Sequence, residues 1–308
     1  MKICILGAGA LGCSIGAALA QGGSDVCLIN RSAAHVDAIN GRGLIVREGG
    51  EERTVRVRAA CDSHGVGPAD LVIVLVKSYD TRLAMDAAAS LVGPQTVVMS
   101  LQNGLGHEDE LAASIGRGHV VAGKTYVGGM MLAPGHIIGG TRGKKTIVGE
   151  LDGRVSPRIA AIAAEFERAG LDTEVTDNIV GTMWDKLLVN VSTGALAALT
   201  RLTYGPLYEV PEIEATAIVA VEEAIAVARA KGVALSIANA RDAWTMASAG
   251  LSRDFKTSIL QSLEKGTRTE IDFINGVVVR EGARLGIATP VNRTLVACIK
   301  GLEKGLTL

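Results

Sequence analysis

The chain has 308 residues, of which 48% are hydrophobic and 20% are charged, and its formal net charge is −1. This length suits two domains with sizeable cores, and a net charge so near zero gives no reason to expect binding to nucleic acid or to an acidic membrane surface. No segment is apolar enough to span a membrane, and the five cysteines and five histidines show neither a disulfide pattern nor metal-ligand spacing. A cytoplasmic protein without a structural metal fits these features.

Residues 1–30 read as a strand, a glycine-rich turn, a helix and a second strand. Lys2–Leu6 (KICIL) and Asp25–Ile29 (DVCLI) are the strands, and residues 13–21 are the helix. The turn between them is Gly7-Ala8-Gly9-Ala10-Leu11-Gly12. The G-x-G-x-x-G spacing in this context is typical of a dinucleotide-binding unit, in which a helix N-terminus faces the pyrophosphate. The alternative is a glycine turn without a ligand.

The residues after the second strand favour one cofactor. Enzymes that bind NAD usually place Asp or Glu there to accept hydrogen bonds from the ribose 2′-hydroxyl. This chain has Asn30-Arg31-Ser32 instead. A guanidinium can hold a 2′-phosphate that a carboxylate would repel. We therefore expect NADPH, with Arg31 as the main anchor and Asn30 and Ser32 as helpers, against the alternative of a solvated loop arginine.

Two further strands are predicted at residues 70–76 (DLVIVLV) and 96–100 (TVVMS). Lys77 follows the first, and Leu101-Gln102-Asn103-Gly104 follows the second. Ligands of open α/β sheets bind beyond the carboxyl ends of the strands. Lys77 and Asn103 are therefore expected to line a cleft, although either position also suits an ordinary loop.

Glycine-rich strands after His119 are expected to run antiparallel and to extend the same sheet. A helix at residues 157–169 and a strand at 171–175 follow. From residue 179 onward the pattern is helical, with helices expected at residues 179–199, 212–231, 236–246, 258–265, 268–285 and 290–302. The predicted organisation is an α/β domain with a mostly parallel sheet (residues 1–177) followed by an all-α domain (residues 178–308).

The stretch MWDKLLVNVSTG at residues 183–194 places polar groups on an apolar helix. Lys186, Asn190 and Thr193 share one strip at the edge of the apolar arc, because residues three and four apart lie on the same face. Asp185 and Ser192 fall on the opposite side, where we expect water. The strip suits side chains that are half buried and reach a cleft between the domains. The alternative is that Lys186 extends past the core to solvent.

Seven motifs occur in order along almost the whole chain. They are GAGALG, Asn30-Arg31, Val76-Lys77, Leu101-Gln102-Asn103-Gly104, Trp184-Asp185-Lys186-Leu187-x-x-Asn190, Ser258-x-Leu260-Gln261 and Arg268-Thr269-Glu270-Ile271-Asp272. Together they resemble the ketopantoate reductase (2-dehydropantoate 2-reductase) family. The resemblance implies a Rossmann domain followed by a helical domain, and reduction of 2-dehydropantoate to (R)-pantoate by NADPH in pantothenate biosynthesis.

The resemblance also implies a function for each site residue. Lys186 is the general acid, and Glu270 holds the substrate hydroxyl and the lysine network, beside the cofactor. Asn190 contacts the substrate, and Ser258 helps bind its carboxylate. Asn103 lies on the nicotinamide side of the cofactor. Lys77 lies near both cofactor and substrate, while the turn formed by Gly7, Ala8, Gly9, Ala10, Leu11 and Gly12, together with Asn30 and Arg31, binds the rest of the dinucleotide.

The chain departs from the family pattern at two places near the substrate. Phe255 stands where the family often has Asn, and Thr193-Gly194 stands where it often has Asn-Pro. A bulkier, more apolar pocket could prefer another 2-oxo acid, so a reductase of a different 2-oxo acid is the first alternative. An NADPH-binding regulatory protein without turnover is the second. The sequence is compatible with a homodimer.

Overall fold

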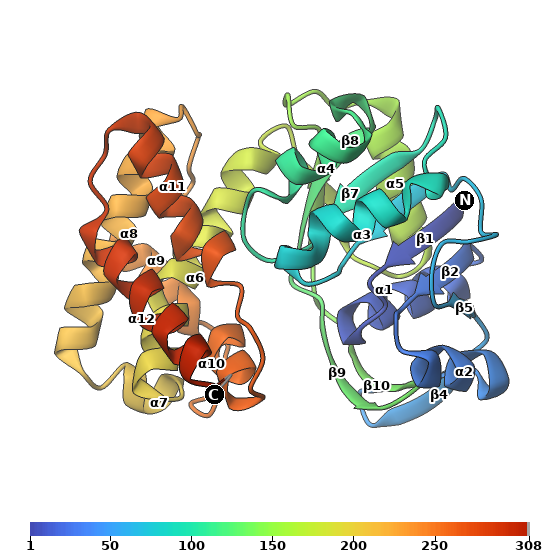
Figure 1. Cartoon of the computed structure of the whole chain (residues 1–308), viewed down its shortest axis with the longest axis horizontal. Helices are drawn as coiled ribbons and strands as arrows, with labels where there is room; N and C mark the ends of the chain where they lie inside the picture. Colours follow the sequence, from blue (N-terminus) through green and yellow to red (C-terminus); the bar gives the residue numbers. More distant parts are fainter. Residues whose placement is uncertain (307–308) are drawn as a thin grey trace. The chain divides into compact units, whose positions relative to one another are not determined.

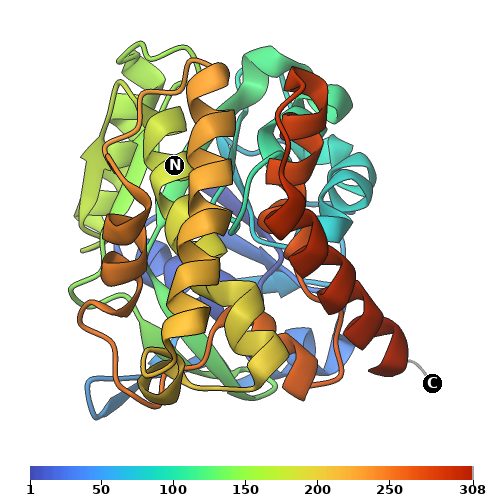
Figure 2. The ribbon, with the colours of Figure 1, turned by 90° about the vertical axis from the view of Figure 1, so that its left-hand side faces the viewer.

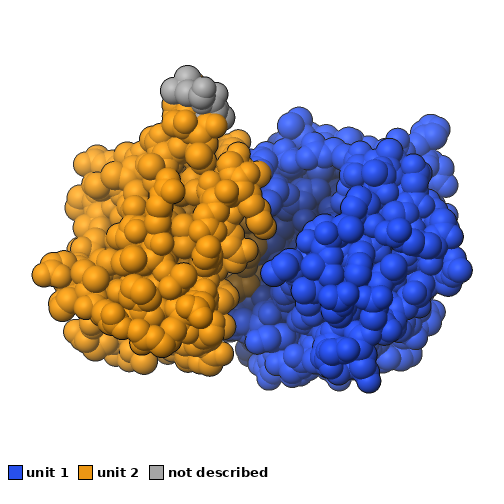
Figure 3. Space-filling view, turned by 90° about the horizontal axis from the view of Figure 1, so that it is seen from below, with its two compact units in different colours: residues 1–102, 107–179 blue, residues 103–106, 180–308 orange. Residues whose placement is uncertain are grey.

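The computed structural model of the protein describes residues 1–306 and divides the chain into two compact units. Unit 1 comprises residues 1–102 and 107–179 (Figure 3). Unit 2 comprises residues 103–106 and the chain from residue 180 onward. Among the described helices, none combines the length and the apolar character that a membrane span requires. Residues 103–106 belong to unit 2 although the residues before them, up to Gln102, belong to unit 1.

Unit 1 is built on an eight-stranded sheet. In spatial order its strands are β12 (Thr173–Val175), β11 (Thr146–Gly149), β8 (Val120–Thr125), β7 (Val97–Ser100), β6 (Leu71–Val74), β1 (Lys2–Leu6), β2 (Asp25–Ile29) and β5 (Arg58–Ala60). Every neighbouring pair is parallel except β11 and β8. All four residues of β6 are buried, as expected for a strand covered on both faces. The predicted mostly parallel sheet is confirmed.

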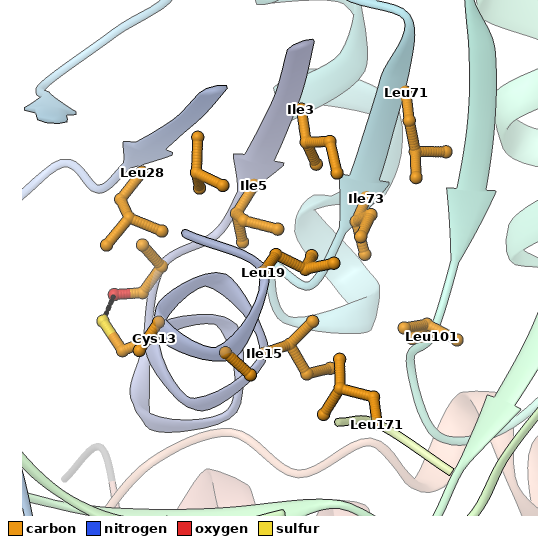
Figure 4. Packing of buried hydrophobic residues seen from close by; sticks show 14 of the residues in the cluster. Ile3, Ile5, Cys13, Ile15, Leu19, Leu28, Leu71, Ile73, Leu101 and Leu171 are labelled. Atoms are coloured by element: carbon orange, nitrogen blue, oxygen red, sulfur yellow. Dashed lines mark hydrogen bonds between the residues drawn. The ribbon is translucent and has the colours of Figure 1, made fainter. Parts of the chain in front are cut away.

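Helical segments cover this sheet (Figure 1). They are α1 (Ala10–Gln21), α2 (Ala33–Arg42), η1 (Ser78–Asp80), α3 (Thr81–Ala87), η2 (Ala89–Leu91), α4 (His107–Ile115), η3 (Arg117–His119) and α5 (Pro157–Arg168). Leu19 of α1 lies beside Ile5 of β1 and Ile73 of β6 in a cluster of buried hydrophobic residues (Figure 4). The close packing of α1 fixes the direction in which its N-terminus and the preceding turn point.

Four more strands form a second sheet, in the order β4 (Glu51–Val55), β3 (Leu44–Glu48), β10 (His136–Gly140) and β9 (Gly128–Ala133). The prediction that all strands after His119 extend the main sheet, running antiparallel, is therefore only partly correct. β11 joins that sheet antiparallel to β8, but β8 runs parallel to β7, and β9 and β10 leave the sheet. Gly129 of β9 lies against the first turns of α1, where a Cβ would come within 2.8 Å of Ser14 Oγ. This glycine allows the second sheet to pack closely on α1.

Unit 2 is helical in the part of the chain that the structure describes. Its helices are α6 (Ile179–Thr200), α7 (Tyr204–Leu207), α8 (Pro211–Ala230), α9 (Ala240–Ser248), α10 (Ser258–Glu264), η4 (Ile271–Phe273), α11 (Asn275–Leu285) and α12 (Pro290–Leu306). Figure 2 shows α8 in orange and α12 in red, two long helices of this unit. The predicted helical second half is confirmed.

The expectation that Asp185 and Ser192 face water is wrong. Asp185 is 9% exposed and Ser192 is fully buried, because helices surround α6 on several sides. The Asp185 carboxylate accepts hydrogen bonds from the backbone N–H of Ser236 (3.1 Å) and of Ile237 (3.1 Å) and from the Ser236 hydroxyl (2.7 Å). A buried charge with several donors costs little, so this polar side of α6 fastens it to the segment before α9.

The single helix expected at residues 268–285 is also wrong. Glu270 precedes the short turn η4, and α11 begins only at Asn275. The carbonyl groups that would continue a helix are used elsewhere: the Asp272 oxygen accepts from Arg280 Nη1 (2.6 Å), and the Phe273 oxygen accepts from the Leu105 N–H (3.0 Å). Glu270 therefore lies in a turn and not on the face of a long helix.

Candidate functional site

The three glycines of the turn after β1 meet three different surroundings. Gly7 has φ = +105°, and a Cβ there would lie 2.4 Å from the backbone nitrogen of Val76. A Cβ on Gly12 would lie 2.5 Å from the Gly7 oxygen. Gly9 has nothing within 4 Å of an added Cβ, and it begins α1 without a side-chain cap. The turn is thus tight on its protein side and open over Gly9, which is what the close approach of a pyrophosphate requires.

The end of β2 is tied to this turn. Asn30 Nδ2 donates to the Ala8 oxygen (2.8 Å), and Asn30 Oδ1 accepts from the Ser32 N–H (2.9 Å). Ser32 begins α2, and its hydroxyl oxygen accepts from the His35 N–H (3.4 Å). Both predicted helpers thus engage the backbone. Arg31, in contrast, extends outward with a side chain that is 89% exposed.

The guanidinium of Arg31 lies against a carboxylate that sequence reasoning did not single out. Arg31 Nη2 donates to Asp80 Oδ2 at 2.9 Å. Asp80 ends η1, the turn that begins after Lys77, and its own N–H donates to the Lys77 oxygen (2.8 Å). The two residues are 49 positions apart, so no local pattern pointed to the pair.

Gln102 joins the ends of β6 and β7. Its Nε2 donates to the Val76 oxygen (2.8 Å) and to Thr81 Oγ1 (2.9 Å), and its Oε1 accepts from the Ser100 hydroxyl (3.0 Å). These bonds hold the strand ends that precede Lys77 and Asn103. Sequence reasoning placed Gln102 in the motif without giving it a function.

Asn103 and the three residues that follow it belong to unit 2. Gly104 has φ = +94°, and a Cβ there would lie 2.4 Å from the Phe273 oxygen. The Leu105 N–H donates to the same oxygen (3.0 Å). The structure therefore places Asn103 beside the η4 segment, which begins immediately after Glu270.

Lys186 and Asn190 are both half buried on α6, while Trp184 is 3% exposed and Leu187 is 2% exposed. Trp184 and Leu187 hold the helix in place and fix its rotation. One turn beyond Asn190, the Gly194 oxygen accepts from Thr257 Oγ1 (3.3 Å). Thr257 caps α10 and precedes Ser258, which is exposed. This bond places Ser258 near the Asn190 side of α6.

Thr193, expected on the same strip, is 2% exposed and turns inward. Its hydroxyl is hydrogen-bonded to that of Tyr204 (3.1 Å). The Tyr204 ring packs on Phe255, with centroids 4.9 Å apart, and the Tyr204 N–H donates to the Phe255 oxygen (3.1 Å). The two departures from the family pattern therefore meet through Tyr204, which sequence reasoning missed.

The second residue of α4, the helix that follows residues 103–106, is a buried acid. Glu108 is 6% exposed, and its Oε1 accepts no hydrogen bond from the described residues. Burial raises the pKa of Glu108 to about 7, with the negative charge of Asp109 adding to the effect. Burial lowers the pKa of the neighbouring His107 to about 4. At neutral pH His107 is uncharged, and Glu108 is close to the midpoint of its titration.

Glu108 makes folding stability depend on pH. Its pKa is higher in the folded chain (about 7) than its ordinary value of 4.5, so its contribution is fully present below pH 4.5 and is lost as pH rises through 7. The shift corresponds to up to about 3 kcal/mol. Glu108→Gln should remove this loss. The melting temperature of the variant minus that of the parent should therefore be larger at about pH 8 than at about pH 5. Glu222→Gln, at an exposed position of α8, serves as the control, and equal gaps at both pH values would contradict the assignment.

Comparison with known proteins gives a family for both parts of the chain. The family Ketopantoate reductase PanE/ApbA matches residues 3–153, and Ketopantoate reductase PanE/ApbA C terminal matches residues 178–303. A relative from Pyrococcus horikoshii named 2-dehydropantoate 2-reductase is 35% identical over 303 residues, which is 98% of each chain. One of the same name from Halobacterium salinarum is 35% identical over 304 residues, covering 97% of this chain and 98% of the relative.

Solved structures of similar proteins match this chain over its full length. A PanE/ApbA family ketopantoate reductase from Ralstonia eutropha is 37% identical, with a TM-score of 0.91 and complete coverage of both chains. D-mandelate dehydrogenase, solved with NADH and anilino(oxo)acetate, is 26% identical, also with a TM-score of 0.91 and complete coverage. The chain therefore belongs to the ketopantoate reductase family.

Proposed function

We propose that this protein reduces 2-dehydropantoate to (R)-pantoate with NADPH. The observation that carries the proposal is membership of the family across both units, in a chain that keeps Lys186 and Asn190 one turn apart on a helix fixed by buried neighbours. The open space over Gly9 and the uncapped N-terminus of α1 fit a dinucleotide pyrophosphate. Arg31, exposed at the end of β2, fits a 2′-phosphate.

In the proposed reaction the reduced nicotinamide supplies a hydride to the ketone carbon. Lys186 donates a hydrogen bond to the ketone oxygen and then gives it a proton as negative charge develops there. Asn190, on the same face of α6, orients the substrate, and Ser258 binds its carboxylate. Glu270 holds the substrate hydroxyl and the lysine, while Asn103 and Lys77 complete the site on the nicotinamide side. The net reaction converts a 2-oxo acid, a proton and NADPH into a 2-hydroxy acid and NADP⁺.

A second candidate is reduction of a different 2-oxo acid by the same residues. The contact of Thr193, Tyr204 and Phe255 favours it. The hydroxyl groups of Thr193 and Tyr204 bond to each other, and the Tyr204 ring packs on that of Phe255. Phe255 is half buried and lies three residues before Ser258 in the sequence. Gly194 adds no side chain to this region, and a Cβ there would lie 3.1 Å from Ile259 Cδ1. Such surroundings offer apolar surface and few partners for a substrate hydroxyl.

Steady-state kinetics on a panel of 2-oxo acids separates the candidates. With NADPH, 2-dehydropantoate should give the highest kcat/KM among acids with hydroxylated, branched alkyl and aromatic side chains. Another acid that exceeds it by about a hundredfold would replace the proposed substrate, since contacts in one pocket discriminate on that scale. NADPH binding without oxidation by any 2-oxo acid would indicate a regulatory protein.

A further inference from the structure

The Arg31–Asp80 ion pair places a carboxylate where a 2′-phosphate is proposed to bind. The side chain of Arg31 is 89% exposed, while that of Asp80 is only 25% exposed. Asp80 is also anchored through its N–H, which donates to the Lys77 oxygen (2.8 Å). Asp80 is therefore the more fixed partner, and Arg31 is the one that can turn toward a ligand.

The positions of the strands explain why the two side chains meet. β2 and β6 flank β1 on either side, and Arg31 and Asp80 lie on the segments that follow the ends of these two strands. The next charged pair along the chain is Arg82 with Asp86 (3.1 Å), and both of these residues lie on α3. Lys77 is the other charged side chain on the segment between β6 and η1. The carboxylate of Asp80 is thus set directly against the guanidinium that NADPH would use.

A 2′-phosphate carries almost two negative charges at neutral pH. It is repelled by a carboxylate that lies close to the arginine that binds it. If Arg31 holds the phosphate, it either gives up its bond to Asp80, which leaves that carboxylate uncompensated, or shares its N–H donors between two anions that repel each other. NADH carries no 2′-phosphate and meets neither effect. A carboxylate near the ribose can even accept a hydrogen bond from the 2′-hydroxyl.

We propose that Asp80 is a specificity-determining residue that reduces the preference for NADPH over NADH. It does so by engaging Arg31 in the free protein and by repelling the 2′-phosphate in the complex. This inference rests on the proposed binding of the 2′-phosphate by Arg31. It implies that the protein accepts both cofactors more evenly than the residues Asn30-Arg31 alone suggest.

The test is equilibrium binding of NADPH and NADH to the full chain without substrate, followed by cofactor fluorescence. Asp80→Asn keeps the shape of the side chain and removes its charge. It should tighten NADPH binding about tenfold and change NADH binding by less than about twofold, with a smaller gain at high salt. Asp86→Asn removes the same charge from the Arg82 pair on α3 and should change neither affinity.

Two outcomes overturn the inference. Weaker NADPH binding by Asp80→Asn would mean that Asp80 positions Arg31 for the phosphate, and unchanged binding would mean that the ion pair has no effect on cofactor choice. Arg31→Ala tests the underlying assignment separately: it should weaken NADPH much more than NADH. Equal losses would refute the 2′-phosphate contact itself. In the Arg31→Ala background, the gain from Asp80→Asn should be smaller, because only the repulsion between the carboxylate and the 2′-phosphate is then left to remove.

Discussion

Lys186→Ala should lower kcat by roughly two to four orders of magnitude, the usual effect of removing a general acid. The reason is electrostatic as well as protonic, because an ammonium group stabilises the charge that grows on the ketone oxygen. KM for the 2-oxo acid should change much less, since the ground-state ketone carries little of that charge. The measurement is steady-state kinetics at saturating NADPH.

The control for this variant is another lysine of unit 2. Lys231, after the end of α8, forms an ion pair with Glu281 of α11. Lys231→Ala should leave kcat within about twofold, because the residue is not part of the proposed site and Glu281 keeps its ion pair with Arg284. A loss of less than about tenfold for Lys186→Ala would remove Lys186 from the mechanism, since general acids contribute more than that. An unchanged melting temperature would show that the helix remains folded.

Sequence periodicity predicted most helices of unit 2 but misjudged how deeply α6 is buried. The helical wheel placed Asp185 on the side expected to face water, yet the carboxylate is enclosed and bonded to the backbone of residues 236 and 237. A wheel describes one helix by itself. It contains no information about a loop 51 residues away that covers the polar side and supplies its donors.

The same limit explains the errors in unit 1. The central strands β1, β2, β6 and β7 were predicted because strands buried on both faces are continuously apolar. The departure of β9 and β10 into a second sheet depends on pairing with β3, which lies far away in sequence. The β3–β4 hairpin itself had a signal, since Gly49-Gly50 adopts positive φ at both positions, as a tight hairpin turn requires.

For the candidate site, the motifs supplied residue types and the structure supplied their partners. The glycine spacing predicted which positions need no side chain, and the structure places backbone atoms against Gly7 and Gly12 but not against Gly9. No motif contains the Arg31–Asp80 pair or the Thr193–Tyr204 bond. Those contacts join segments that are brought together only when the chain has folded, so they require tertiary structure.

Gly9→Ala separates binding from folding at the glycine turn. Gly9 has φ = −75° and ψ = −163°, which alanine adopts readily, and its added Cβ would touch no protein atom. The melting temperature should therefore stay the same or rise slightly, since alanine restricts the unfolded chain. Affinity for both NADPH and NADH should fall about a hundredfold, because the methyl group would displace the pyrophosphate from the N-terminus of α1.

Two other glycines make this prediction specific. Gly41→Ala, on α2, also adds a methyl group into open space and should leave cofactor binding unchanged. Gly7→Ala should instead lower the melting temperature, because it places a Cβ 2.4 Å from the Val76 nitrogen at φ = +105°. Full cofactor affinity in Gly9→Ala would mean that the pyrophosphate does not pass over this turn. Among the described residues nothing would then explain a glycine at position 9, since none of their atoms lies within 4 Å of an added Cβ.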